Sequence, residues 1–322
     1  MLSEFDLIKQ YFVRARPAHA ALALGIGDDC ALLQPTAGMQ LAISTDMLVE
    51  NRHFFAGADP RCLGHKALAV NLSDLAAMGA TPLAFTLALA LPKADRTWLA
   101  GFSEGLFALA DQHGCELIGG DTTRGPLNIC ITVFGEIAPG RALRRSGARV
   151  GDDIWVSGSL GDARLTLAGL RDEFPVDQAT LALASPRMHV PEPRVALGAA
   201  LAGLAHAALD ISDGFVGDLG HILAASAVGA RVNVDALPAG PALARQETTT
   251  RRQFCAQGGD DYELCFTAAA DRRDAIEAAA RAAGTAVTRV GVIEQQTGLR
   301  LVDAANAPVD LHAAGFDHFA LP

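Results

Sequence analysis

The segment from Leu83 to Leu91 places the strongest constraint on the fold. Its sequence, Leu-Ala-Phe-Thr-Leu-Ala-Leu-Ala-Leu, has a large apolar residue at every second position and a small residue between them. Because successive side chains of a β-strand point to opposite faces, this alternation predicts a strand with one heavily buried face. Pro82 and Pro92 bound the segment, which is also far too short to cross a bilayer. A sheet must therefore form around it.

Helical periodicity alternates with further strand-like segments along the whole chain. The predicted helices span residues 61–78, 96–113, 215–228 and 271–283, and the further strands span residues 41–44, 129–134, 154–157, 207–211, 231–234, 262–266 and 287–293. Gly79, Gly114 and Gly229 are each placed to end a helix. Strand–helix alternation in both halves predicts an α/β (α+β) protein with two domains, 1–148 and 149–322, divided in the turn-rich segment 147–153.

Composition and charge narrow the class of protein. Half of the 322 residues are apolar, which is enough for two domains with real cores, and the formal net charge is −10 without any compensating run of Lys and Arg. We therefore expect no nucleic-acid or membrane partner. The segment from Met1 to Gln10 lacks the features of a signal peptide, and the six cysteines form no CxxC pair. Reduced thiols in a cytoplasmic protein are the expected state.

Six short segments place aspartate close to glycine or to a polar partner. Most are predicted to lie at strand ends or in loops, and Asn71–Asp74 lies inside a helical pattern. They are Gly25–Asp29, Ser44–Asp46, Asn71–Asp74, Gly119–Thr123, Asp210–Gly214 and Gly258–Glu263. Mg²⁺ prefers oxygen ligands and bridges carboxylates to phosphates, and glycine lets the backbone approach a phosphate closely. Each Gly-Asp pair alone is ordinary turn chemistry, but together the segments predict a polycarboxylate site.

The common nucleotide-binding signatures are absent from the sequence. There is no GxxxxGK[ST] segment, Gly25-Ile-Gly27 lacks the third glycine of a dinucleotide fingerprint, and no HRD or DFG set occurs. If ATP binds, it therefore binds through another architecture.

The acidic segments also carry a resemblance to a known family. Gly-Asp-Asp-Cys-Ala, Ser-Thr-Asp-Met, Ala-Val-Asn-Leu-Ser-Asp-Leu-Ala-Ala-Met-Gly-Ala, Leu-Ile-Gly-Gly-Asp-Thr-Thr, Leu-Asp-Ile-Ser-Asp-Gly and Gly-Gly-Asp-Asp-Tyr-Glu-Leu occur in this order. From Phe5 to about Phe319 the sequence resembles the thiamine-monophosphate kinase family. The Asn–Asp helix motif is shared with the wider superfamily of aminoimidazole ribonucleotide synthetase, selenophosphate synthetase and hydrogenase maturation proteins.

The resemblance implies both a fold and a reaction. The fold would be that of aminoimidazole ribonucleotide synthetase, with a mixed sheet flanked by helices in each domain. The N-terminal domain would bind ATP and several Mg²⁺ ions and form a homodimer through its sheet, and the C-terminal domain would close the cleft. The reaction would be direct in-line transfer of the ATP γ-phosphate to thiamine monophosphate, the last step of thiamine diphosphate biosynthesis.

The resemblance also implies roles for particular residues. Asp121 and Arg145 would be catalytic, and Gly120, Asp121, Arg145 and Ser212 would contact ATP. The implied metal ligands are Asp29, Ser44, Thr45, Asp46, Asp74, Asp121, Asp210 and Asp213. The implied substrate contacts are His53, Asp260 and Phe316. Taken without the family, Arg145 fits a solvated arginine, His53 an ordinary loop histidine and Phe316 a packing residue, so these alternatives stay open.

One position departs from the family pattern, because Asp260 stands where the family usually has glutamate. Aspartate keeps the charge but reaches less far by one methylene. The rival assignments within the superfamily fit less well, because the segment from Met1 to Ala20 has no cysteine for selenophosphate synthesis and the chain has no cysteine-bearing C-terminal tail. A non-catalytic nucleotide-binding module is the rival from another class, and it would bind Mg-ATP without consuming it.

Overall fold

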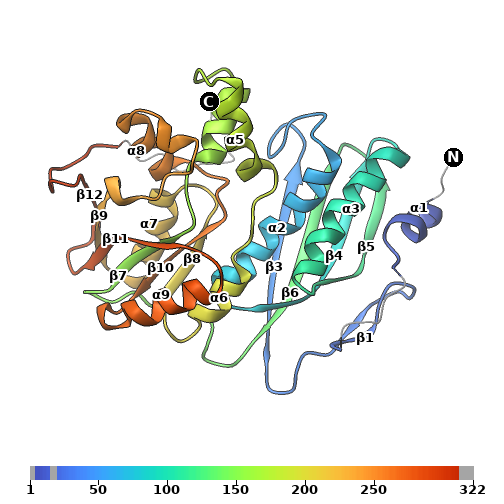
Figure 1. Cartoon of the computed structure of the whole chain (residues 1–322). Helices are drawn as coiled ribbons and strands as arrows, with labels where there is room; N and C mark the ends of the chain where they lie inside the picture. The colour runs from blue at the N-terminus through green and yellow to red at the C-terminus, as the bar shows by residue number, and fades with distance from the viewer. Residues whose placement is uncertain (1–3, 15–19, 312–322) are drawn as a thin grey trace. The chain divides into compact units, whose positions relative to one another are not determined.

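The computed structural model describes residues 4–14 and 20–311, and Phe316 lies outside them. The chain divides into two compact units. The first unit contains the residues up to 75 together with 80–140, and the second contains residues 76–79 together with those from 141 onward (Figure 1). The separate roles predicted for residues 1–148 and 149–322 stay predictions.

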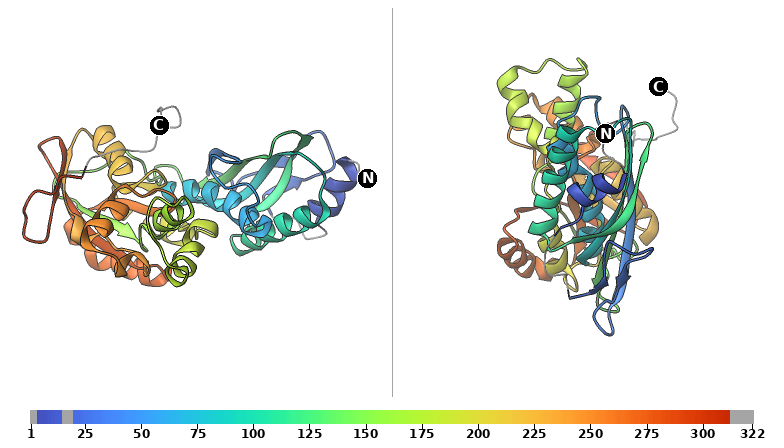
Figure 2. Two further views of the ribbon diagram at one scale, coloured as in Figure 1. Left: turned by 90° about the horizontal axis from the view of Figure 1, so that it is seen from above. Right: turned by 90° about the vertical axis from the view of Figure 1, so that its right-hand side faces the viewer.

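The first unit is built on a four-stranded mixed sheet. Its strands lie in the order β3 (Gln40–Val49), β6 (Asn128–Ile137), β4 (Thr81–Leu91) and β5 (Glu116–Arg124). Only the β4–β5 pair is parallel. Helices α2 (Pro60–Met78) and α3 (Arg96–Gln112) cover one face of this sheet (Figure 2). The alternation in Leu83–Leu91 is confirmed, because all five large residues of this segment are buried.

Strand β3 has two contrasting faces. Ser44 pairs across the strands with Val133 and Asp46 with Ile131, both of which are buried, so these polar residues lie on the face covered by helices. The residues between them belong to the opposite face, where Leu41, Ile43 and Met47 are exposed. The short helix α1 (Glu4–Tyr11) and the hairpin β1 (Leu22–Leu24) and β2 (Leu32–Leu33) complete the unit.

The second unit holds a six-stranded mixed sheet. Its strands lie in the order β12 (Gly298–Val302), β9 (Gly229–Asn233), β11 (Val287–Glu294), β7 (Asp153–Ser157), β10 (Glu263–Ala268) and β8 (Ala207–Ile211). The β12–β9 pair is parallel and the other pairs are antiparallel. Every residue of β7, β8 and β10 is buried, which indicates that both faces of the sheet are covered.

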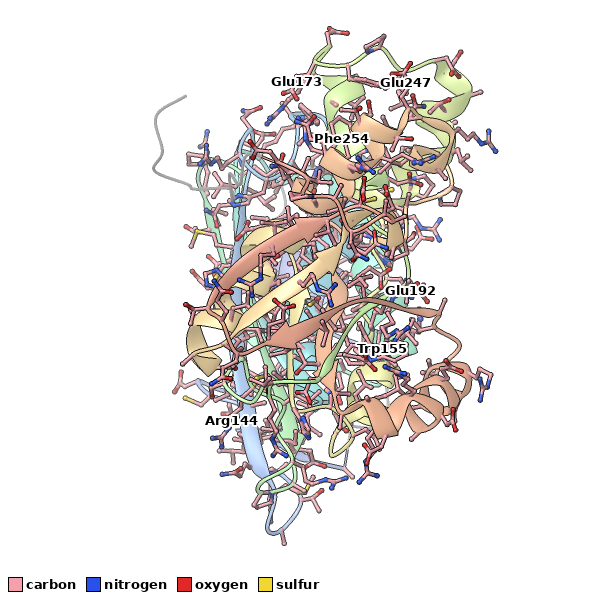
Figure 3. All side chains as sticks on the ribbon, turned by 90° about the vertical axis from the view of Figure 1, so that its left-hand side faces the viewer. Arg144, Trp155, Glu173, Glu192, Glu247 and Phe254 are labelled. Atoms are coloured by element: carbon pink, nitrogen blue, oxygen red, sulfur yellow. The ribbon has the colours of Figure 1, made fainter. Side chains whose placement is uncertain are left out.

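Helices pack on both faces of this sheet. On one face, Ile154, Leu209 and Cys265 share a core with α4 (Asp162–Leu170), α7 (Phe215–Ser226) and α8 (Thr248–Gln257). On the other face, Trp155, which is labelled in Figure 3, stacks on Phe266 with ring centroids 6.3 Å apart. This second core also includes residues of α6 (Val195–Leu201) and α9 (Arg273–Ala282).

The predicted mixed α/β architecture is confirmed, with four local corrections. Helix α7 ends at Ser226 and is capped by Ala227, which has φ 55°, so the chain leaves the helix earlier than predicted and Gly229 begins β9. The helix predicted from residue 271 begins with the 3₁₀ turn Ala270–Arg272. Asp46 and Asp121 lie within strands rather than at strand ends or in loops. Strand β5, α4, α5 (Gln178–His189), α6 and α8 were not predicted.

Candidate active site

The first part of the site is formed by strand β3 and helix α2. Residues two apart on a strand share a face, as do residues three apart on a helix, so Ser44 and Asp46 can meet Asn71 and Asp74 in two pairs. The hydroxyl of Ser44 donates to Oδ2 of Asp74 at 2.5 Å. The backbone N–H of Asp46 donates to Oδ1 of Asn71 at 3.0 Å. The two sequence motifs therefore meet within one unit.

The polar pairs sit in an otherwise apolar environment. On α2, Asp74 is half-buried between Leu72 and Leu75, which are 0% and 1% exposed. The amide nitrogen of Asn71 donates to the carbonyl of Ala67 at 2.9 Å, which directs the amide oxygen toward β3. A half-buried carboxylate costs free energy unless it has polar partners, and Ser44 supplies one. The pairing brings together side-chain oxygens, which are the ligands that a hard cation such as Mg²⁺ prefers.

The neighbouring candidates lie on the other face of the sheet. Thr45 alternates with Ser44 and Asp46, and its hydroxyl pairs with that of Thr132 at 2.8 Å. In the register of the sheet, Asp121 pairs with Ala88 on β4. Asp121 and Thr45 are both exposed. Their predicted metal contacts are therefore not tested by the pairing between β3 and α2.

The backbone at position 120 leaves no room for a side chain. Gly120 has φ +146°, and a Cβ built there would lie 1.9 Å from the carbonyl oxygen of Leu87 on β4. Only glycine permits β5 to approach β4 this closely. The residue next to the predicted catalytic Asp121 is thus fixed by backbone contact.

Two further candidates of the first unit lie in loops. Asp29 is exposed between β1 and β2. His53 is half-buried after β3, and its Nδ1 accepts the backbone N–H of Val49 at 3.0 Å. Because Nδ1 is an acceptor, the neutral ring carries its proton on Nε2 and can donate only from that atom.

The second part of the site follows β8 in the other unit. Asp210 is the penultimate residue of this strand and is 8% exposed, whereas Asp213 is exposed in the turn that leads into α7. One oxygen of Asp218 accepts the backbone N–H groups of Ser212, Asp213 and Gly214 at 3.0, 3.1 and 3.1 Å. A carboxylate in the first turn of a helix can accept hydrogen bonds from backbone N–H groups at the start of the helix that have no partner within it. Asp218 therefore holds the turn that carries the predicted ligands.

Sequence analysis missed the role of Asp218. The available signal was an acidic residue four positions after Gly214, in the first turn of the helix that was predicted to start at residue 215. Burial raises the pKa of Asp218 to about 6, and the nearby charge of Asp213 acts in the same direction, whereas the backbone donors oppose the increase.

The loop from Gly258 to Glu263 lies against the end of β8. The backbone N–H of Asp260 donates to the carbonyl of Ser212, and that of Tyr262 to the carbonyl of Ile211, both at 2.8 Å. These two bonds bring the predicted substrate residue Asp260 beside the predicted nucleotide residue Ser212. The two acidic motifs of the second unit thus form one surface.

Arg145 lies in the second unit, before β7 and next to Arg144, which is labelled in Figure 3. Its backbone is fixed, because the hydroxyl of Ser226 donates to the carbonyl of Arg145 at 3.0 Å. Its side chain is exposed. A guanidinium on a fixed backbone can hold phosphate oxygens, although its role as a catalytic residue stays a prediction.

Metal binding is not evident from the side-chain positions alone. Among residues 4–14 and 20–311, no group of three or more His, Cys, Asp or Glu side chains is arranged to hold a metal ion. The predicted ligands occur instead as the β3–α2 pairs, the Asp210–Gly214 turn and separate exposed carboxylates. Their assignment as Mg²⁺ ligands stays a prediction.

The two units define the class of protein. Residues 27–137 match the family model of the AIR synthase related protein, N-terminal domain, and residues 149–304 match that of the corresponding C-terminal domain. The chain is 48% identical to thiamine-monophosphate kinase of Salmonella typhimurium over 322 residues, and this match covers 99% of each chain. The chain belongs to the thiamine-monophosphate kinase family, and the predicted family resemblance is confirmed.

Two solved structures support this placement. The crystal structure of thiamine-monophosphate kinase from Stenotrophomonas maltophilia is 48% identical, with a TM-score of 0.83 over 88% of this chain and 91% of that one. A structure described as AaThiL complexed with AMPPCP and TMP is 27% identical, with a TM-score of 0.77 over 88% and 89%. None of the helices in the described parts of this chain is long and apolar enough to cross a membrane.

Proposed function

We propose that this chain transfers the γ-phosphate of ATP directly to the phosphate of thiamine monophosphate, with several Mg²⁺ ions bound. The overall reaction is ATP-dependent phosphorylation of thiamine monophosphate to thiamine diphosphate, which follows from the family to which the chain belongs. To this overall reaction the proposal adds the direct transfer, the bound Mg²⁺ ions and the roles of individual residues.

The pairing of β3 with α2 carries the proposal. On the covered face of the sheet, the hydroxyl of Ser44 contacts the carboxylate of Asp74, and the backbone N–H of Asp46 contacts the amide oxygen of Asn71, so the oxygen donors of these residues belong to one face. These donors fit Mg²⁺, which prefers oxygen ligands and binds few protein groups beside substrate phosphates. Bound Mg²⁺ would neutralise charge on the phosphates of the two substrates. The remaining proposed ligands are Asp29, Thr45, Asp121, Asp210 and Asp213.

The protein groups have separate roles in this proposal. Gly120 and Ser212 lie beside carboxylates and offer backbone or hydroxyl contacts to ATP, and the exposed guanidinium of Arg145 is suited to hold phosphate oxygens. His53 donates from Nε2 to the acceptor, and the carboxylate of Asp260 contacts a cationic part of it. The acceptor phosphate is already a nucleophile near neutral pH, so neither a strong general base nor a covalent enzyme intermediate is needed.

Product analysis tests the reaction and the role of Asp121 together. The chain is incubated with ATP, Mg²⁺ and thiamine monophosphate, and thiamine diphosphate is detected by ³¹P NMR. We expect product with the wild type, and a loss of at least 100-fold in the Asp121→Ala variant. Unchanged activity in that variant would remove Asp121 from the catalytic residues.

Direct transfer has its own test. ATP carrying a chiral thiophosphate at the γ-position should give inverted configuration at phosphorus, because one in-line displacement inverts it. Retention of configuration, or a stable phosphorylated chain isolated without acceptor, would show two successive transfers.

We also propose that the chain is a homodimer and that it is cytoplasmic. The exposed apolar residues Leu41, Ile43 and Met47 share one face of β3 with Thr45, and together they give the first unit a largely apolar surface suited to a second copy. The described cysteines are all free thiols, in keeping with a reducing compartment. Light scattering tests the dimer, and cell fractionation tests the compartment.

A further inference from the structure

The loop from Gly258 to Glu263 contains two residues with an uncommon backbone. Asp260 has φ 70° and Tyr262 has φ 51°, both in the left-handed region. Aspartate is tolerated in this region, but an aromatic residue adopts it rarely because its Cβ approaches the following carbonyl. Such a conformation persists only where the surrounding structure fixes it, and it occurs often at functional sites.

Two buried carboxylates, those of Asp261 and Glu263, anchor this loop to the interior of the second unit. Asp261 is fully buried, and both of its oxygens accept the backbone N–H of Gly161, at 2.9 and 3.1 Å. Glu263 is also fully buried, and it accepts hydrogen bonds from Arg187, Arg194 and the hydroxyl of Ser157. The residues that alternate with these anchors, Asp260 and Tyr262, are half-buried.

The side chains of Asp260 and Tyr262 meet at the surface of the loop. The phenol of Tyr262 donates to Oδ1 of Asp260 at 3.0 Å. Two backbone bonds to Ser212 and Ile211 hold the same two residues against the end of β8. This hydrogen bond joins two half-buried side chains of the same loop. Its effect is to fix the orientation of the Asp260 carboxylate.

We infer that Tyr262 is a positioning residue for the thiamine-monophosphate acceptor, and that it acts by holding the carboxylate of Asp260 in its binding orientation. The inference rests on the proposed role of Asp260 as a substrate contact. A carboxylate repels the phosphate of the acceptor, so Asp260 binds the cationic end, which carries the thiazolium ring. Because Asp260 is one methylene shorter than the glutamate usual in the family, its reach depends more on a fixed orientation.

A double-mutant cycle tests whether the two residues act together. Tyr262→Phe removes only the hydroxyl, and Phe is no more strained than Tyr at this φ. We expect KM for thiamine monophosphate to rise about tenfold, with kcat and KM for ATP changed less than twofold. In the Asp260→Ala background, Tyr262→Phe should have no further effect. Tyr11→Phe is the matched control, because these are the two tyrosines of the chain.

The outcomes separate the two claims. If Asp260→Ala raises KM for the acceptor but Tyr262→Phe does not, the role of Asp260 stands and the inference about Tyr262 is overturned. Independent effects of the two substitutions on KM would also overturn it. If Asp260→Ala leaves KM unchanged, the proposed substrate contact fails and the inference fails with it. A near-wild-type melting temperature for Tyr262→Phe excludes unfolding as the cause of a raised KM.

A spectroscopic measurement gives a readout that does not depend on turnover. Labelling with 3-fluorotyrosine should give two ¹⁹F resonances, and Tyr11→Phe identifies the one that belongs to Tyr262. Saturating thiamine monophosphate with Mg²⁺ and a non-hydrolysable ATP analogue should shift the Tyr262 resonance and leave that of Tyr11 in place. An unmoved Tyr262 resonance at saturation would overturn the inference.

Discussion

Gly120 allows a quantitative prediction from backbone geometry. The substitution Gly120→Ala would place Cβ 1.9 Å from the oxygen, 2.6 Å from the carbon and 2.8 Å from the nitrogen of Leu87. All three are backbone atoms of β4, so no side-chain rotation can relieve the overlap. Strands β4 and β5 must separate by about 1 Å, and a displacement of that size beside positioned phosphates costs on the order of 100-fold in rate.

The same change strains the backbone itself. Alanine at φ +146° costs about 1–3 kcal/mol, which should lower the melting temperature of the first unit by roughly 5 °C. The assay is kcat/KM for both substrates together with thermal unfolding. Gly119→Ala is the matched control, because the nearest atom to its Cβ would be Cγ2 of Thr86 at 4.0 Å. Equal activity losses in the two variants would refute the reasoning.

Three further predictions concern stability and assembly. Arg194→Ala should cost about 1–3 kcal/mol in urea unfolding, because the buried Glu263 loses one of its two arginine partners and keeps Arg187. Arg289→Ala, at a half-exposed pair with Asp153, should cost less than about 1 kcal/mol, and equal losses in the two variants would contradict this. Burial raises the pKa of Asp162, so its contribution to stability is present at low pH and is lost as the pH rises through the raised pKa. Relative to Asp162→Asn, the wild type should therefore lose stability as the pH rises above the ordinary pKa of an aspartate, and parallel curves of stability against pH would argue against it. Ile43→Lys should give a monomer in light scattering, because it places a charge on the proposed dimer surface. Val150→Lys is the matched control and should stay a dimer, since Val150 is 58% exposed and Ile43 is 59% exposed. A dimer in both variants would exclude the β3 face as the interface.

The sequence predicted elements with a clear hydrophobic period, including α2 and β8, which also carry the site residues Asn71, Asp74 and Asp210. The strand around Leu87 was predicted because nothing interrupts its alternation, and all its large residues are buried. In contrast, β3 was predicted to end at Ser44, although it continues to Val49. Ser44 and Asp46 place polar groups at positions that face the covered side of the sheet, and a pattern based on hydrophobicity stops there.

The missed elements have related physical causes. Strand β5 contains Gly119 and Gly120, which have low strand propensity, and it is held in place by its pairing with β4. Helix α6 is only seven residues long, and α8 begins with three threonines, so neither has a strong helical signal. Tertiary pairing and packing decide these segments.

The candidate site was predicted as a set of residues but not as an arrangement. The contact between Ser44 and Asp74 joins two motifs that are separated along the chain, and the spacing of aspartates does not reveal it. The left-handed backbone of Tyr262 has no sequence signal at all, because glycine and asparagine are the residues that usually mark it.

The length of the chain leading through strand β3 affects two properties at once, the proposed metal site and the exposed apolar surface. The residues of β3 alternate between the face that carries Ser44 and Asp46 and the face that carries Ile43 and Met47. Loss or gain of a single residue before this segment would exchange the two sets, because side chains repeat every two residues. Such a change would place apolar side chains opposite Asn71 and Asp74 of α2, and Ser44 and Asp46 on the exposed apolar surface. Substitutions can alter either property separately, whereas a change in length would alter both at once.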